Sequence, residues 1–261
     1  MDFLRSSIFL LSRMISLFLR DLRNLTVRAR GLLSLISSSN VFKLASPSDL
    51  FPFHLHQLKK STIFNPNGVI HVGAHDGAEL PFYRSLGLTK IYLFEPQLKY
   101  AQLLRKRYGR DRRVEVFSDA LGSSATHSEI FTEIEGSPNR SASASLLRPK
   151  QHLQDFDYVQ FNLASPDLVS VSTLDSFGIV DADLLVIDTQ GYELEVLKGA
   201  LQTLAHVKWI IFEYWTNEAY EGNPTEQELL SFVAAHGFLP VLKSYDRTFG
   251  DYLVARSEFI R

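Results

Sequence analysis

The sequence predicts a doubly wound α/β fold, in which a mostly parallel sheet of seven strands carries helices on both faces. Short apolar runs alternate along the chain with segments of helical periodicity, as in successive strand–helix–strand units. A chain of 261 residues, 45% of them hydrophobic, is long enough for one such domain and an extension. The connections between parallel strands are expected to be right-handed.

Seven apolar runs are the expected strands. They cover residues 68–74, 90–96, 114–121, 183–189, 207–214, 238–244 and 252–255, and the last two are expected to form a hairpin pair. The expected helices cover residues 78–86, 98–108, 192–204 and 225–236. Thr225 and Glu228 form a capping box at the start of the last helix, while Gly87 and Gly237 mark two helix ends.

The chain divides into an extension and a main domain. We expect an N-terminal helical extension and linker over residues 1–60 and the main domain over residues 61–261. Residues 122–182 interrupt the alternation, and two runs at 128–134 and 168–173 predict a β-hairpin within this insertion. Because long inserted loops often hold the substrate, we expect the insertion to act as a substrate loop.

The extension contains a basic amphipathic segment in residues 1–30. Its apolar residues recur at alternating steps of four and three, and arginines fall on the opposite helical face. No stretch here approaches the roughly 20 uncharged residues that a membrane-spanning helix needs. Three interpretations stay open: peripheral contact with an anionic membrane surface, packing on the main domain or a partner, and a targeting peptide.

The composition excludes several classes of protein. A net charge of −2 and a pI near 6.4 give no overall field that attracts nucleic acid. The absence of cysteine excludes disulfides, thiolate catalysis and cysteine-based zinc sites. No cluster of metal-ligating residues is visible in the sequence either, so we expect no metal and no nucleic-acid partner. The expected location is cytoplasmic, with peripheral membrane contact as the open alternative, and the sequence predicts no particular oligomeric state.

The expected ligand site lies at the carboxyl end of the first strand. In an open parallel sheet the ligand binds where the strand order reverses, and the first strand is expected at that point. Gly73 and Gly77 allow a sharp turn and a close backbone approach, and the following helix N-terminus favours a carboxylate. Glu95 ends the second strand 22 residues after Gly73, where an acid can bind ribose hydroxyls. This combination predicts an adenosine-type cofactor.

His75 distinguishes between two cofactors of this type. A dinucleotide site prefers a glycine two residues after Gly73, whereas this chain has His75, whose side chain would crowd a pyrophosphate. S-adenosylmethionine carries no phosphate, so the sequence favours the methyl donor over NAD.

Four motifs resemble the FkbM family of methyltransferases. They are His71-Val-Gly-Ala-His-Asp-Gly77, Phe94-Glu-Pro96, Ser143-Ala-Ser-Leu-Leu147 and Ile187-Asp-Thr-Gln-Gly-Tyr-Glu193, and their order and spacing match over about residues 65–258. His71 stands where many members carry an acid. The resemblance implies a Rossmann-like class I methyltransferase sheet, S-adenosylmethionine as the donor, and often a sugar or natural-product hydroxyl as the acceptor.

The cofactor-binding candidates follow from these motifs. The turn residues are expected at the methionine arm, Glu95 at the ribose hydroxyls, and the exit of the third strand at the adenine. The full set is His71, Gly73, Ala74, His75, Gly77, Glu79, Glu95, Pro96, Asp119, Ala120 and Leu121.

Two acids and two serines are the candidates for the acceptor side. Asp188 and Glu213 end the fourth and fifth strands, and either can take the proton of a hydroxyl acceptor. The alternatives are a helix-capping Asp188 and a solvated Glu213. Ser143 and Ser145 are expected to bind a polyhydroxylated acceptor, or else to lie in a flexible linker.

The sequence therefore predicts an S-adenosylmethionine-dependent methyltransferase. We expect it to act on a hydroxyl of a small-molecule or glycan acceptor, such as a sugar, glycolipid or natural product. Two alternatives stay open: a nucleotide-cofactor oxidoreductase, and a non-catalytic module docked through the N-terminal helix.

Overall fold

A computed structural model of the protein describes residues 64–134, 142–244 and 248–259. The expected helical extension therefore lies outside the described residues, as do residues 135–141 of the insertion. The described residues up to Arg256 belong to one compact unit. No helix in these ranges combines the length and the apolar character that a bilayer crossing requires.

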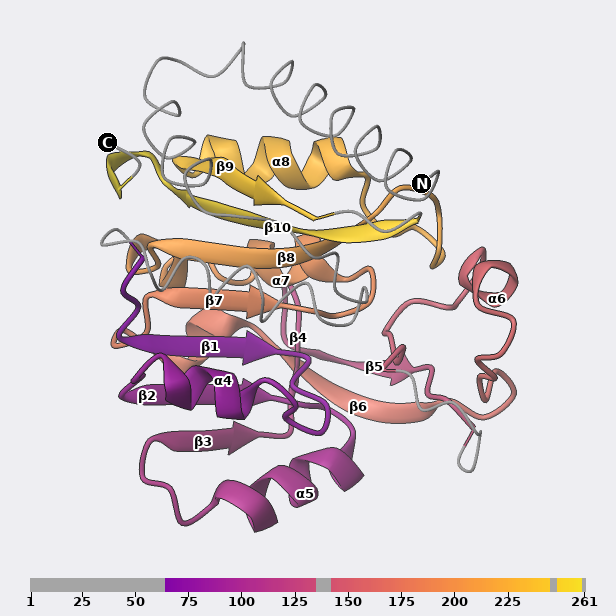
Figure 1. Ribbon diagram of the computed structural model, residues 1–261. Helices are drawn as coiled ribbons and strands as arrows, with labels where there is room; N and C mark the ends of the chain where they lie inside the picture. Colours follow the sequence, from indigo (N-terminus) through magenta and orange to yellow (C-terminus); the bar gives the residue numbers. More distant parts are fainter. Residues whose placement is uncertain (1–63, 135–141, 245–247, 260–261) are drawn as a thin grey trace, which may run out of the picture. The chain divides into compact units, whose positions relative to one another are not determined.

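The described chain is built on a seven-stranded sheet with the order β3-β2-β1-β7-β8-β10-β9 (Figure 1). Its strands are β1 (Gly68–Val72), β2 (Lys90–Phe94), β3 (Val114–Phe117), β7 (Leu184–Ile187), β8 (Trp209–Trp215), β9 (Phe238–Lys243) and β10 (Phe249–Arg256). The first five pair in parallel, and β10 lies antiparallel between β8 and β9. The predicted fold class and the final hairpin pair are thus confirmed.

The strand order reverses at β1. The chain proceeds outward from β1 through β2 to β3 and then returns to the other side of β1 with β7. The register places Val72 of β1 opposite Phe94 of β2 and Ile187 of β7, so these three strands end at the same edge. Ligands of doubly wound sheets bind at such an edge, outside the carboxyl ends of the strands.

Helices cover both faces of the sheet. Ile70 and Val72 of β1 pack in one buried cluster with residues of α7 (Glu193–Lys198) and α8 (Glu226–Ala235). His71 points to the opposite face, because side chains alternate along a strand, and meets Tyr83 of α4 (Leu80–Ser85). Helix α5 (Leu98–Tyr108) follows β2. Strands β1, β7 and β8 are buried throughout, as expected for a sheet covered on both faces.

The single strand predicted over residues 114–121 is wrong, because the chain leaves the main sheet after Phe117. It resumes as β4 (Ala120–Leu121) in a smaller sheet with the order β4-β6-β5. Strand β5 (Thr126–Ile130) pairs antiparallel with β6 (Asp167–Ser172), and α6 (His152–Asp155) lies between them in the sequence. Residues 122–182 thus hold the hairpin pair, and β4 adds a parallel third strand.

Helix ends follow local chemistry. Thr225 and Glu228 form the predicted capping box of α8, and Gly87 ends α4 with a φ of 76°. The helix predicted over residues 192–204 is shorter than expected, since α7 ends at Lys198 and a separate 3₁₀ turn covers Thr203–Ala205. At the break, a Cβ atom on Gly199 would lie 2.0 Å from the Gly122 carbonyl oxygen, so only glycine permits this contact.

Candidate active site

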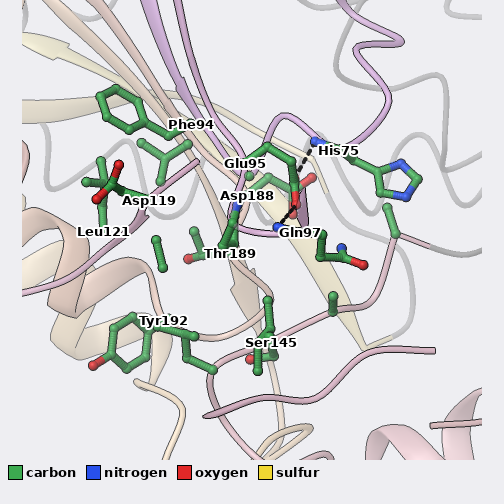
Figure 2. A pocket seen from close by; sticks show the side chains of 18 residues that line it. His75, Phe94, Glu95, Gln97, Asp119, Leu121, Ser145, Asp188, Thr189 and Tyr192 are labelled. Atoms are coloured by element: carbon green, nitrogen blue, oxygen red, sulfur yellow. Dashed lines mark hydrogen bonds between the residues drawn. The ribbon is translucent and has the colours of Figure 1, made fainter. Parts of the chain in front are cut away.

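A hollow that is partly open to solvent lies at the carboxyl ends of β1, β2 and β7 (Figure 2). Its lining combines the exits of these strands with β4 and with residues 142–146 of the insertion. Nine of the site residues predicted from the sequence line it: Gly73, His75, Glu95, Pro96, Asp119, Ala120, Leu121, Ser145 and Asp188. The other six, which are His71, Ala74, Gly77, Glu79, Ser143 and Glu213, do not.

Glu95 is fixed in the hollow by two backbone donors. Its Oε2 accepts a hydrogen bond from the His75 N–H at 2.7 Å, and its Oε1 accepts one from the Gln97 N–H at 2.8 Å (Figure 2). Burial raises the pKa of this carboxyl to about 7, although both amides oppose the rise. A carboxylate has about four acceptor positions, so two hydrogen bonds leave capacity for a ligand.

The turn after β1 uses its own amides internally. The Gly73 and Ala74 N–H groups both donate to the Phe94 carbonyl, and the Gly77 N–H donates to the Ala74 carbonyl. Together with the His75 amide, four N–H groups expected to face a ligand carboxylate are therefore engaged within the protein. The Gly73, Ala74 and His75 amides connect the end of β1 to the end of β2, and the Gly77 amide closes the turn itself.

Glycine is required at two turn positions for different reasons. Gly73 has a φ of 86°, and a Cβ atom there would lie 1.8 Å from the Asp188 carbonyl oxygen. This contact lets β1 and β7 leave the sheet side by side. Gly77 has a φ of 77°, and a Cβ atom there would meet Leu104 of α5 at 2.6 Å, so its packing faces the helix layer.

His71 and Glu79 lie away from the hollow. The His71 Nδ1 is hydrogen-bonded to the Tyr83 hydroxyl at 3.0 Å, and burial lowers the pKa of His71 to about 4. The imidazole is therefore neutral at neutral pH. Burial raises the pKa of Glu79, which precedes α4. Because His71 belongs to β1, its hydrogen bond to Tyr83 holds α4 against the sheet.

The break between β3 and β4 opens beside an aromatic cluster. Phe94 stacks on Phe117 with ring centroids 4.7 Å apart, and Phe177 meets Phe94 edge-on at 4.8 Å. Asp119 lies at this break and accepts a hydrogen bond from the Ser172 hydroxyl at 3.0 Å. Of the three rings only Phe94 lines the hollow, and together with Leu121 it forms an apolar wall beside the Asp119 carboxylate.

The motif after β7 forms a loop held by its last residue. Glu193 Oε1 accepts hydrogen bonds from the Thr189 N–H and hydroxyl and from the Gly191 N–H, at 3.0 to 3.1 Å. Burial raises the pKa of Glu193 to about 7. This capping fixes the backbone from which Asp188 and Thr189 project into the hollow.

Asp188 and Glu213 share one donor but differ in exposure. Gln190 Nε2 donates to Asp188 Oδ1 and to Glu213 Oε2, both at 2.9 Å. Solvent in the hollow reaches Asp188, whereas Glu213 is buried and also accepts from the Trp215 indole N–H at 3.0 Å. Desolvation by the surrounding protein raises the pKa of both carboxyls, and that of Glu213 well above its usual range.

The two candidate serines take part in hydrogen bonds that fix the insertion to the rest of the domain. The Ser145 hydroxyl donates to the Gln190 carbonyl at 2.7 Å and accepts from the Leu147 N–H at 3.0 Å. Ser143 is buried, and its carbonyl oxygen lies 3.1 Å from the Tyr220 hydroxyl, whose single hydrogen it shares with Gln190 Oε1 at 2.9 Å. These bonds place residues 142–146 across the hollow.

The sequence analysis missed several lining residues, among them Gln97, Thr189 and Tyr192. Gln97 follows the Phe-Glu-Pro motif, and its position at the start of a helix was the available signal for a free N–H beside Glu95. Thr189 and Tyr192 lie inside the quoted Ile-Asp motif, where only Asp188 was singled out. Gln190 was missed although it carries the contact between both candidate acids.

The fold is a Rossmann-like α/β domain, and the hollow lies where the strand order reverses, which is the usual ligand position in such sheets. A family model described as "Methyltransferase FkbM domain" matches residues 71–240, which is more than half of the chain. The chain therefore belongs to the FkbM methyltransferase family and is a methyltransferase. The oxidoreductase and non-catalytic alternatives find no support in this match.

The chain resembles one curated protein and several solved structures at low sequence identity. The chain is 28% identical over 176 residues to the 2-O-methyltransferase NoeI of Sinorhizobium fredii (strain NBRC 101917 / NGR234), covering 64% of this chain and 72% of NoeI. The crystal structure of methyltransferase FkbM from Methylobacillus flagellatus KT is 16% identical with a TM-score of 0.49, covering 73% of this chain but only 44% of that one. Magnesium protoporphyrin IX methyltransferase from Synechocystis PCC 6803, solved with bound SAM, is 9% identical with a TM-score of 0.44, covering 92% and 96%.

Proposed function

We propose that the chain is an S-adenosylmethionine-dependent O-methyltransferase that acts on a hydroxyl of a small-molecule or glycan acceptor. The observation that carries the proposal is the Glu95 carboxylate, which two loop amides fix inside the hollow where β1, β2 and β7 end. Membership of the methyltransferase family supports methyl transfer, and the relative named as a 2-O-methyltransferase supports oxygen as the acceptor atom.

The residues of the hollow fit the proposed donor. The remaining acceptor positions of Glu95 suit the two hydroxyls of a ribose. Phe94 and Leu121 offer apolar surface to a base, and Asp119 offers an acceptor to an exocyclic amino group. Gly73 would lie against the methionine arm through its Cα surface, since its N–H is engaged with Phe94.

When bound, S-adenosylmethionine supplies a methyl group that its sulfonium already activates, so the protein chiefly positions groups and removes a proton. We assign the removal of the acceptor proton to Asp188, which lines the hollow and is reached by solvent. Its raised pKa makes it a stronger base than an ordinary aspartate. Glu213 lies outside the lining, so its proposed role is to support Asp188 through Gln190.

Two measurements test this function. Calorimetry with S-adenosylhomocysteine tests the donor site, and transfer of a radioactive methyl group to a panel of sugars and glycosides tests the acceptor class. Asp188→Asn should lower the turnover of the best acceptor by about 100-fold and leave the affinity for S-adenosylhomocysteine unchanged. Glu115→Gln, an exposed change on β3, is the matched control. Absence of S-adenosylhomocysteine binding to the wild type would refute the proposal.

A further inference from the structure

Gln190 adopts an uncommon backbone conformation at the edge of the hollow. Its φ of 56° lies in the left-handed region, and besides His75 it is the only described residue other than glycine there. Few residues with a side chain adopt this region, and such strain persists where surrounding contacts fix the residue. The conformation turns the side chain of Gln190 away from the lining and toward β8, where it is buried.

The Gln190 amide uses both of its hydrogens on carboxylates. Nε2 lies 2.9 Å from Asp188 Oδ1 and 2.9 Å from Glu213 Oε2. This orientation of the amide, with Nε2 toward the two acids, suits an ionised Asp188, because a carboxylate only accepts hydrogen bonds. The Oε1 atom in turn accepts from the Tyr220 hydroxyl at 2.9 Å. Three different segments therefore fix one amide group.

The insertion fixes the backbone of the same residue. The Ser145 hydroxyl donates to the Gln190 carbonyl at 2.7 Å, and the Tyr220 hydroxyl also contacts the carbonyl of Ser143 at 3.1 Å. Tyr220 packs with Trp215 in a small buried cluster. Gln190 is thus the point at which β7, β8 and the insertion meet.

We infer that Gln190 is a positioning residue for methyl transfer, because its amide holds the Asp188 carboxylate at the hollow and ties it to the buried Glu213. The inference rests on the proposed function, in which Asp188 takes the acceptor proton. Asp188 Oδ2 accepts no hydrogen bond from any residue that the structure describes, so it is the oxygen left to receive that proton.

The hydrogen bond from the Gln190 amide determines in which direction the pKa of Asp188 should change when that amide is removed. A hydrogen bond to a carboxylate favours its charged form, so removal of the Gln190 amide should raise the pKa of Asp188. The titratable groups that act on the pair come from every neighbouring element. Glu79 acts on Asp188, and so does His71 on β1 when it is protonated, while Asp188 itself, Glu193 on α7 and Asp251 on β10 act on Glu213. Tyr83 of α4 faces Asp188, and Tyr220 faces both acids.

The test compares Gln190→Met with the wild type and with the matched control Gln102→Met, an exposed change on α5. The first readout is the titration of the Asp188 carboxyl by ¹³C NMR, assigned with Asp188→Asn. The second is the pH profile of kcat on the best acceptor of the glycoside panel. The third is the affinity for S-adenosylhomocysteine by calorimetry.

In Gln190→Met we expect the Asp188 titration and the acidic limb of the kcat profile to move to higher pH. We also expect kcat to fall by about tenfold or more, with an unchanged affinity for S-adenosylhomocysteine. An unmoved titration overturns the inference, as does a loss of S-adenosylhomocysteine binding that parallels the loss of kcat.

Tyr220→Phe is the second variant and covers the case in which Gln190→Met does not fold. It removes the hydroxyl that holds Gln190 Oε1 and keeps the ring, so the same shifts are expected at smaller size. An unmoved Asp188 titration in Tyr220→Phe also overturns the inference. If the wild type binds no S-adenosylhomocysteine, the proposed function fails. The titration does not depend on that result.

Discussion

Glu95 is the residue whose replacement should reveal most about the donor site. Glu95→Gln keeps the size of the side chain but replaces one acceptor oxygen with an NH₂ group. That group would face the His75 or Gln97 N–H, so two donors would meet where a hydrogen bond of 2.7 or 2.8 Å now lies. A hydrogen bond to a charged group contributes about 1.5–3 kcal/mol, so affinity for S-adenosylhomocysteine should fall by about 10- to 100-fold.

The wild-type affinity should also depend on pH. Burial raises the pKa of Glu95 to about 7, so the carboxyl of the free protein holds its proton over part of the range below neutrality. Ribose hydroxyls donate to the ionised form, so binding favours release of that proton. Affinity should therefore rise with pH, by about tenfold from about pH 6 to about pH 8, and level off above.

Calorimetry at several pH values, in two buffers of different ionisation enthalpy, measures the affinity and the proton release together. Glu95→Gln should remove the pH dependence, whereas Glu115→Gln, exposed on β3, should keep it. A wild-type affinity that stays constant over this range, together with wild-type affinity in Glu95→Gln, would show that the carboxylate does not contact the ligand.

Three further substitutions test the frame of the site. Gly73→Ala places a Cβ atom 1.8 Å from the Asp188 carbonyl oxygen at a φ of 86°, so urea unfolding should show a loss of at least about 2 kcal/mol. Tyr83→Phe leaves the buried Nδ1 of His71 without its partner, so stability should fall by about 1–3 kcal/mol, and a Tm equal to that of the wild type would contradict the observed hydrogen bond. Thr225→Ala removes the capping box of α8 and should cost about 1 kcal/mol in the same urea assay, with an unchanged affinity for S-adenosylhomocysteine.

The order of strands and helices was predictable because apolar periodicity is a local property of the sequence. The main strands were found from this periodicity, and the capping box from the spacing of Thr225 and Glu228. The break at residues 118–119 was missed, although the polar Ser118 and Asp119 separate Val114–Phe117 from Ala120–Leu121. What the local sequence does not show is that β4 pairs with the distant β6 in a second sheet.

The limits of prediction from the sequence are clearer in the candidate site. His71 lies in a strand that is buried on both faces, so the sequence pattern does not tell which face a side chain takes. Its contact with Tyr83 decides that point. Glu213 was expected beside the acceptor because it lies near the end of its strand. Its position is set by Gln190 and Trp215, and the Gln190 contact spans 23 residues between strands.

The buried acids around the hollow each accept hydrogen bonds from the protein, although Oε2 of Glu193 has no hydrogen-bond partner among the described residues. Glu95 has two backbone amides, Glu193 has the loop that it caps, and Glu213 has an amide and an indole. Burying a carboxylate without such donors costs several kcal/mol, and the group then protonates instead. Asp188 is the exception in exposure, since it meets solvent in the hollow and shares its single donor with Glu213. A carboxylate that is held but not saturated with donors retains basicity, and this property distinguishes a proton acceptor from a structural acid.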